Sequence, residues 1–203
     1  MPSLAERLAQ EGGWAAGLDL TEGLAPGEVL AGAELEGCRI TGAVLERAVL
    51  RDGTFTDCTF TGCDLSMVVL DGSRFTDCRF VECKALGVGW GRAAPAPLST
   101  RPWDMERCRL DLGSFRDAQA AGSRFADCSM REVDLAGADL RRATFAGCDL
   151  GGATVAGTDL READLVGASG YLLDPTANRV RGMRVDAVAA GGILRALGLV
   201  VED

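Results

Sequence analysis

The sequences Ala-Asp-Leu-Arg-Arg at residues 138–142 and Ala-Asp-Leu-Val-Gly at residues 163–167 show the pattern that decides the fold of this chain. Each unit has a small residue, a polar residue and a bulky apolar residue, followed by two further residues. Every fifth residue from Leu30 to Leu165 gives 28 positions, and Leu, Ile, Val, Met, Phe or Trp fill 24 of them. Two residues earlier, small residues fill 25 of 27 positions. A period of five fits neither an α-helix nor a flat strand, so the sequence indicates a repeat architecture.

The cysteines follow the same period, because every gap between neighbouring cysteines is a multiple of five residues. This period suits a solenoid in which each unit forms one side of a four-sided coil, with the small and bulky residues pointing inward. Residues 20 apart should then stack as parallel neighbours, with coils about 4.8 Å apart. The predicted stacks are Cys38, Cys58 and Cys78; Cys63 and Cys83; Cys108, Cys128 and Cys148; Phe55, Phe75 and Phe115; Phe60 and Phe80; Phe125 and Phe145.

The repeat resembles the consensus of the pentapeptide-repeat family over about residues 30–170. The resemblance implies an all-β solenoid, a right-handed quadrilateral β-helix. We therefore expect an N-terminal cap at residues 1–29 and the β-helix at 30–170, with an interrupting loop at about 91–104. Residues 171–203 should form a C-terminal cap and dimerisation segment.

Short helices are expected at both ends of the chain. Ser3 and Glu6 fit a capping box that begins a helix over residues 4–10. Asp186 can N-cap an α-helix over about residues 187–197, with Gly198 as its stop. This second helix has little polar surface, so one side should cap the last coil and the other should bury a partner. We expect a two-fold homodimer through Val188, Ile193, Leu194, Leu197 and Leu199.

Residues 91–104 interrupt the repeat with three prolines, which cannot donate the hydrogen bonds of a β-ladder. Trp90 and Leu110 are 20 residues apart, so the numerical register survives the break. The segment is either a protruding loop or a distorted coil. A loop is favoured because Leu98 and Trp103 are too large for the small inward position. The candidate partner contacts on this loop are Arg92, Arg101 and Trp103.

The composition excludes several classes of function. The chain has no His and a net charge of −9, with 30 Asp and Glu against 21 Lys and Arg. Lack of His rules out Ser–His–Asp and Cys–His catalysis, and a net acidic chain binds nucleic acid poorly. Zinc sites need more closely spaced cysteines, so we expect buried, reduced thiols and neither metal nor cofactor. No apolar run could span a membrane and no signal peptide opens the chain, which predicts a cytoplasmic protein that is not an enzyme.

Acidic residues form the candidate partner-binding surface. In the last coils, the outward position before the bulky residue is Asp in five of seven repeats. The alternative is that Asp belongs to the repeat consensus and keeps the rod soluble. Asp57, Asp77 and Asp117 are expected to form another column. The candidate acidic contacts are Asp134, Asp139, Asp149, Asp159 and Asp164, of which Asp139 and Asp159 should stack on one face.

A narrower resemblance suggests a function. Residues 63–67, 83–90, 99–103 and 173–178 are similar to the topoisomerase-protecting branch of the family, which includes the quinolone-resistance (Qnr) and albicidin-resistance proteins. The resemblance implies a dimeric acidic rod that occupies the DNA-binding saddle of DNA gyrase, a type II topoisomerase, and protects it from inhibitors. Its carboxylates would imitate DNA phosphates, which carry one charge per about 1.7 Å of duplex axis. Two alternatives stay open: a structural or regulatory scaffold with another partner, and a small-molecule binder that uses the Pro/Trp loop.

Overall fold

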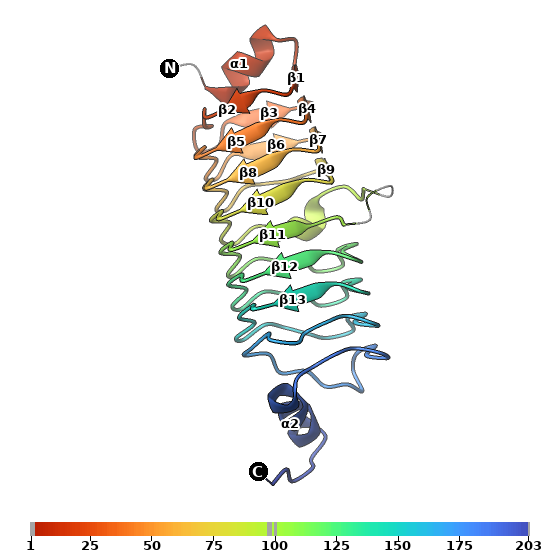
Figure 1. Ribbon diagram of the computed structural model, residues 1–203. Helices are drawn as coiled ribbons and strands as arrows, with labels where there is room; N and C mark the ends of the chain where they lie inside the picture. Colours follow the sequence, from red (N-terminus) through yellow and green to blue (C-terminus); the bar gives the residue numbers. More distant parts are fainter. Residues whose placement is uncertain (1–2, 97–98, 100, 203) are drawn as a thin grey trace.

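The computed structural model describes residues 3–96, 99 and 101–202, which form a stack of coils with a helix at each end (Figure 1). The paired strands run parallel, so the prediction of a β-solenoid is confirmed. The elements are α1 (Leu4–Gln10), β1 (Trp14–Ala16), β2 (Asp19–Leu20), β3 (Val29–Ala31), β4 (Glu34–Glu36), β5 (Arg39–Thr41), β6 (Val49–Arg51), β7 (Thr54–Thr56), β8 (Thr59–Thr61), β9 (Arg74–Thr76), β10 (Arg79–Val81), a 3-10 turn η1 (Trp90–Arg92), β11 (Asp104–Glu106), β12 (Arg124–Ala126), β13 (Thr144–Ala146) and α2 (Ala187–Ala196).

The five-residue unit explains the shape of the coil. The bulky residue of each unit points inward, as Leu35, Phe55 and Phe75 do in one in-register stack. The small residue two positions earlier, such as Cys58, is also buried and lets the chain turn tightly. The corner residue two positions after the bulky one has a positive φ, for example 52° at Asp57. Asp and Gly tolerate this left-handed conformation better than most residues, so they recur at the corners.

The coil has four faces, which we number 1 to 4 in chain order from Trp14. Face 1 carries the sheet β1-β4-β7-β9 and ends in the bridged positions Asp139, Asp159 and Arg179. Face 2 carries the seven-stranded sheet from β2 to β13. Face 3 consists of isolated bridges such as the one between Asp64 and Lys84, and face 4 begins with β3 and β6.

The stacking register shifts in the middle of the rod. Arg79 of β10 pairs with Asp104 of β11, a spacing of 25 residues where the other strand pairs have 20. The prediction that Trp90 stacks on Leu110 is therefore wrong. Trp90 instead stacks on Phe115, with ring centroids 5.8 Å apart. One extra five-residue unit has entered the chain between faces 1 and 2, and the strand ladder continues on either side of it.

This shift also corrects the predicted columns. Lys84 pairs with Arg109, so Cys83 and Cys108 occupy equivalent positions and the cysteines form two columns rather than three. Phe60 and Phe80 stack as predicted, as do Phe125 and Phe145. Phe115 belongs to face 4 rather than to the stack of Phe55 and Phe75, and Asp117 likewise leaves the predicted column of Asp57 and Asp77.

Trp103 fills a gap that the extra unit leaves in the core. Ala94 still pairs with Arg74, but the next residue, Pro95, is exposed and supplies no bulky inward side chain. Trp103 is only 6% exposed and packs against Phe75 and Trp90, with ring centroids 5.7 and 5.1 Å away. The expectation that Trp103 is too large for the small inward position is therefore wrong, because the neighbouring face contributes no competing side chain. Leu98, the other residue in that expectation, lies outside the described residues.

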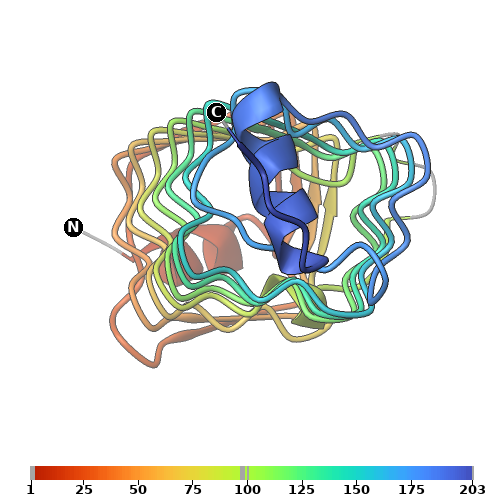
Figure 2. The ribbon, with the colours of Figure 1, turned by 90° about the horizontal axis from the view of Figure 1, so that it is seen from below.

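The ladder extends beyond residues 30–170 at both ends. Trp14 pairs with Glu34 near the N-terminus, and Asp164 pairs with Arg184 near the C-terminus. Both expected helices are present: α1 has the Ser3–Glu6 capping box, and Asp186 caps α2. Viewed along the rod, α2 lies across the end of the last coil (Figure 2). Within the described part of the chain, neither helix has the length needed to cross a membrane.

Candidate interaction surfaces

The five predicted acidic contacts are spread over all four faces. Asp139 and Asp159 pair with each other on face 1 and stack as predicted. The remaining three lie on faces 2, 3 and 4, since their bridge partners are Thr144, Ser129 and Ser114, respectively, for Asp164, Asp149 and Asp134. The C-terminal coils therefore contain one stacked pair of carboxylates rather than a continuous acidic row.

Each of these five carboxylates is paired with an arginine. The hydrogen bond from Arg161 holds the pKa of Asp159 at about 2, and Arg141 lowers the pKa of Asp139 in the same way. The pKa of Asp149 is lowered first by the Gly151 N–H and then by Arg131. The pairs are Arg116–Asp134 at 2.8 Å, Arg141–Asp139 at 2.6 Å, Arg131–Asp149 at 2.8 Å, Arg161–Asp159 at 2.6 Å and Arg184–Asp164 at 2.5 Å. Sequence reasoning missed these pairs, although arginines recur 18 or 20 residues from an aspartate.

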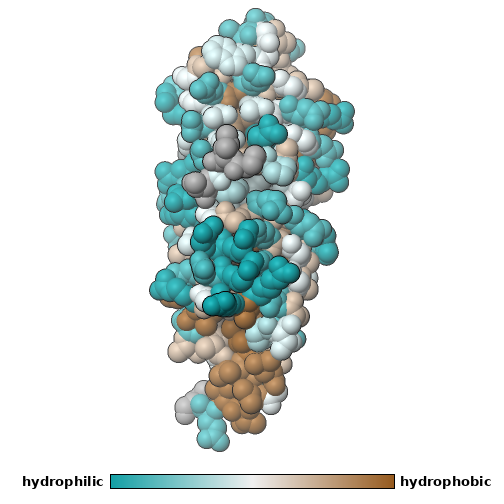
Figure 3. All heavy atoms as spheres, turned by 90° about the vertical axis from the view of Figure 1, so that its right-hand side faces the viewer, coloured by the Kyte–Doolittle hydropathy of each residue, from teal (hydrophilic) through white to brown (hydrophobic). Residues whose placement is uncertain are grey.

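Face 1 differs in charge between its two ends. Near the N-terminus, Glu34, Glu36, Asp57 and Asp77 form no ion pair with any described residue. Near the C-terminus, five exposed arginines gather over three stacked coils, and we call them the arginine patch: Arg141, Arg142, Arg161, Arg179 and Arg181. Figure 3 shows this hydrophilic cluster in the lower half of the rod, above the apolar C-terminal end.

The predicted loop contacts are not equally available. Arg92 pairs with Asp71 at 2.6 Å and Arg101 pairs with Asp104 at 3.2 Å, with both arginines more than half exposed at 68% and 52%. Trp103 is buried in the core, so it cannot serve as a surface contact in this structure. The hollow beneath the loop, lined partly by Trp90 and Trp103, has a volume of only about 110 Å³. Drug-sized ligands occupy roughly 300–1,000 Å³, so this hollow does not support the small-molecule alternative.

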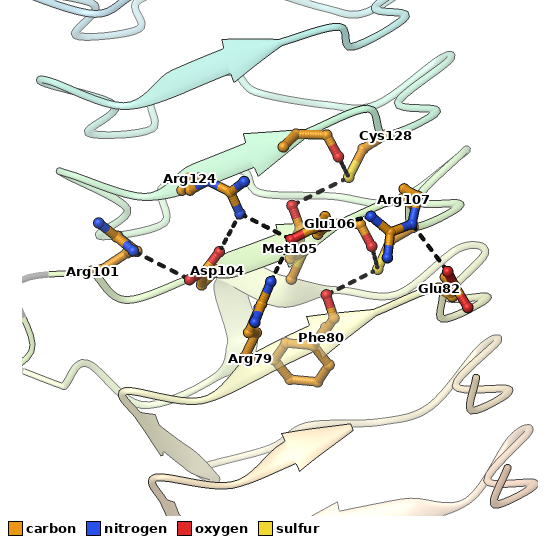
Figure 4. Close-up of polar contacts among 12 residues, drawn as sticks. Arg79, Phe80, Glu82, Arg101, Asp104, Met105, Glu106, Arg107, Arg124 and Cys128 are labelled. Atoms are coloured by element: carbon orange, nitrogen blue, oxygen red, sulfur yellow. Dashed lines mark hydrogen bonds and ion pairs between the residues drawn. The ribbon is translucent and has the colours of Figure 1, made fainter. Parts of the chain in front are cut away.

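Face 2 carries an ion-pair network across the inserted unit (Figure 4). Arg79 of β10 donates to Glu106 of β11, and this hydrogen bond lowers the pKa of Glu106. Arg124 of β12 donates to Asp104 at 3.0 Å, and Arg107 donates to Glu82 at 3.0 Å. The network thus joins coils before and after the insertion, where exposed pairs gain strength by acting together.

The C-terminal end exposes the residues predicted to form a dimer. Ile193 is the exception, since it is partly buried against the core. We call the exposed set the apolar end, and with their exposed fractions its members are Leu172 (76%), Val188 (87%), Leu194 (40%), Leu197 (45%), Leu199 (53%) and Val200 (89%).

All eight cysteines are free and buried, as their inward register predicts. Their thiols donate to backbone carbonyls, as Cys83 does to Phe60 O at 3.4 Å. Burial raises the pKa of the Cys38 thiol, which keeps it protonated and unreactive. No group of three potential metal ligands comes together among the described residues.

Stacked parallel coils, inward small and bulky residues and a surface of outward side chains define a β-helical solenoid. The chain belongs to the pentapeptide-repeat family, whose profile matches eight copies of the repeat within residues 29–66, 54–85, 114–152 and 138–169. No curated protein matches the sequence.

Solved structures share the fold at low sequence identity. A trypsin-treated variant of QnrB1, a plasmid-mediated fluoroquinolone resistance protein, is 17% identical with a TM-score of 0.73, over 94% of this chain and 99% of its own. A second trypsin-treated QnrB1 variant is 16% identical with a TM-score of 0.71, over 94% and 97%. HetL, a pentapeptide repeat protein involved in heterocyst differentiation regulation in the cyanobacterium Nostoc, is 19% identical with a TM-score of 0.58, over 90% and 92%.

Proposed function

We propose that this chain is a non-enzymatic interaction protein that binds a type II topoisomerase, namely DNA gyrase, in place of duplex DNA and protects it from inhibitors. The observation that supports the proposal most is the match to QnrB1, which extends over nearly the full length of both chains. The net charge of −9 suits a partner whose binding site is built to attract DNA phosphates.

A homodimer through the apolar end completes the proposed rod. Val188 and Val200 are almost fully exposed, at 87% and 89%, and a second copy would cover them across a two-fold axis. Such a dimer doubles the length of the rod and places the C-terminal coils of both chains at its centre. The topoisomerase saddle would then meet these coils first.

The arginine partners make the imitation of DNA partial. At the centre of the dimer, Asp139 and Asp159 offset the charge of Arg141 and Arg161 rather than standing as free charges. Their removal would leave uncompensated arginines facing a cationic saddle, and like charges placed together oppose binding. We therefore expect these central carboxylates to matter more than Asp57 and Asp77, which lie far from the axis and act by long-range attraction that salt screens.

A supercoiling assay with DNA gyrase, with and without a fluoroquinolone, tests the proposal together with competition against duplex DNA. The wild type should compete with DNA, and the Asp139→Asn/Asp159→Asn double variant should compete markedly less. The matched Asp57→Asn/Asp77→Asn pair should lose less. If the wild type neither competes nor changes the effect of the inhibitor, the chain is a scaffold for another partner and the proposal is wrong.

A further inference from the structure

The arginine patch carries more positive charge than its surroundings can neutralise. Its five arginines lie beside three carboxylates, those of Asp139, Asp159 and Glu162, so the patch has a local excess of two positive charges. The whole chain, by contrast, has a net charge of −9. Arg142 and Arg181 form no ion pair with any described residue, and both are exposed. Such a cluster is electrostatically unfavourable until an anion binds to it.

Two of these guanidinium groups are held in place by carboxylates. Arg141 donates from Nε and Nη2 to Asp139 at 2.8 and 2.6 Å, and Arg161 donates to Asp159 with the same two distances. Because Asp139 and Asp159 pair across adjacent coils, the two arginines are stacked about 4.8 Å apart along the rod. Neither Nη1 group has a carboxylate partner among the described residues, so both retain donors for a ligand.

Arg141, Arg142 and Arg161 line one hollow of about 150 Å³, which Glu162 also lines. A phosphoryl dianion has three acceptor oxygens and nearly two negative charges, which matches three guanidinium groups around a small hollow. A carboxylate offers two oxygens and one charge, and it would gain less from the third arginine. The lining of the hollow has no aromatic side chain on which a nucleic-acid base could stack.

We propose that this hollow is a phosphoryl-binding site formed by Arg141, Arg142 and Arg161. Asp139 and Asp159 position two of the arginines, and Arg142 supplies an unpaired guanidinium at the corner. The remainder of the rod is acidic and repels extended polyanions, so the ligand is a single phosphoryl group. The site goes beyond the proposed function, because it requires no topoisomerase.

Titration with inorganic phosphate in a phosphate-free buffer of low ionic strength tests the site, by calorimetry or NMR. Arg142→Gly is the informative variant because glycine already occupies the equivalent corner at Gly122 and Gly182, so the backbone should tolerate it. Its matched control is Arg47→Gly, because Arg47 is an exposed corner residue on another face and has the same φ of 58° as Arg142. Thermal unfolding of both variants confirms that they remain folded.

The wild type and Arg47→Gly should bind one phosphate with equal affinity, and Arg142→Gly should bind it about fivefold more weakly or worse. The proposal is wrong if the wild type shows no saturable binding up to about 10 mM phosphate, or if Arg142→Gly binds as tightly as the control. This result is independent of gyrase, so the failure of either proposal can be told from the failure of the other.

Two further ligands identify the source of the phosphoryl group. A short phosphoserine peptide that binds more tightly than inorganic phosphate would support a phosphorylated protein as the ligand, whereas equal or weaker binding would support a small phosphate compound. The same peptide with glutamate in place of phosphoserine should bind at least about fivefold more weakly. Equal binding of the two peptides would overturn the proposal, because it would show that the patch attracts any anion.

Discussion

The two ends of the rod are closed in different ways. At the N-terminus, α1 buries Leu4 and Leu8 against the first coil, leaving them 3% and 1% exposed. At the C-terminus, Gly191 is the one buried residue among those described in α2, and Val188 is 87% exposed. A solenoid end needs a cap because its core would otherwise face water. The contrast shows that α1 finishes the fold, whereas α2 both covers the last coil and presents an apolar surface to a partner.

Replacing Leu8 by Ala should have the largest effect on stability at either end. Leu8 is fully buried, and truncation of a buried leucine costs about 2–5 kcal/mol through lost contacts and the cavity left behind. The same change at Leu197, which is 45% exposed, should cost under about 1 kcal/mol in the monomer. Chemical denaturation of both variants, with the Leu197→Ala protein diluted below its dimer affinity, measures the difference. Equal losses would contradict the assignment of α1 as the finished cap.

Replacing Leu197 by Glu should break the proposed dimer. A charge at the centre of an apolar interface loses its hydration, and we expect the dimer dissociation constant to rise at least about hundredfold, or about 2.7 kcal/mol. Light scattering over a concentration series measures the change, and Glu36→Gln on the N-terminal coils is a control that should leave assembly unaffected. A wild type that is monomeric at micromolar concentration would refute the dimer.

Asp159→Asn should destabilise the protein by about 1 kcal/mol, because it removes the paired carboxylate of Arg161 while most of the arginine remains hydrated. Asp57→Asn, at the opposite end of the same face, should change stability by less than about 0.5 kcal/mol because Asp57 has no ion-pair partner among the described residues. Thermal unfolding at neutral pH compares the two. A larger loss at Asp57 would reverse the charge contrast along face 1.

The smallest expected effect is a pH dependence that separates the same two variants. The pKa of Asp159 is about 2 in the folded protein and 3.8 without its partners, so its contribution is present above about pH 4. It should disappear as the pH falls from about 4 toward 2, since the carboxylate then becomes protonated in both states. The stability difference between wild type and Asp159→Asn should therefore shrink over this range. A constant difference would show that Asp159 acts through packing rather than charge.

The sequence predicted the coil, its inward positions and both helices because each depends on residues close in the chain. The stacking beyond β10 could not be predicted, since an insertion of five residues preserves the period of five while shifting the 20-residue coil by one side. Trp90 and Leu110 therefore kept a spacing of 20 without being neighbours. The ion pairs of Asp134 and Asp149 were missed for a related reason: their arginines lie 18 residues earlier, on the preceding coil.

The inserted unit also has a consequence for how such proteins change over evolutionary time. Had the five residues joined the coil, everything after them would have rotated by a quarter turn, and each surface below would have changed its azimuth relative to those above. Because the chain excludes the unit between Ala94 and Asp104, this phase slip is cancelled within a single coil. Repeats of this kind can therefore gain or lose one unit while the functional surfaces on either side keep their common orientation, provided that one large side chain, here Trp103, fills the vacancy in the core.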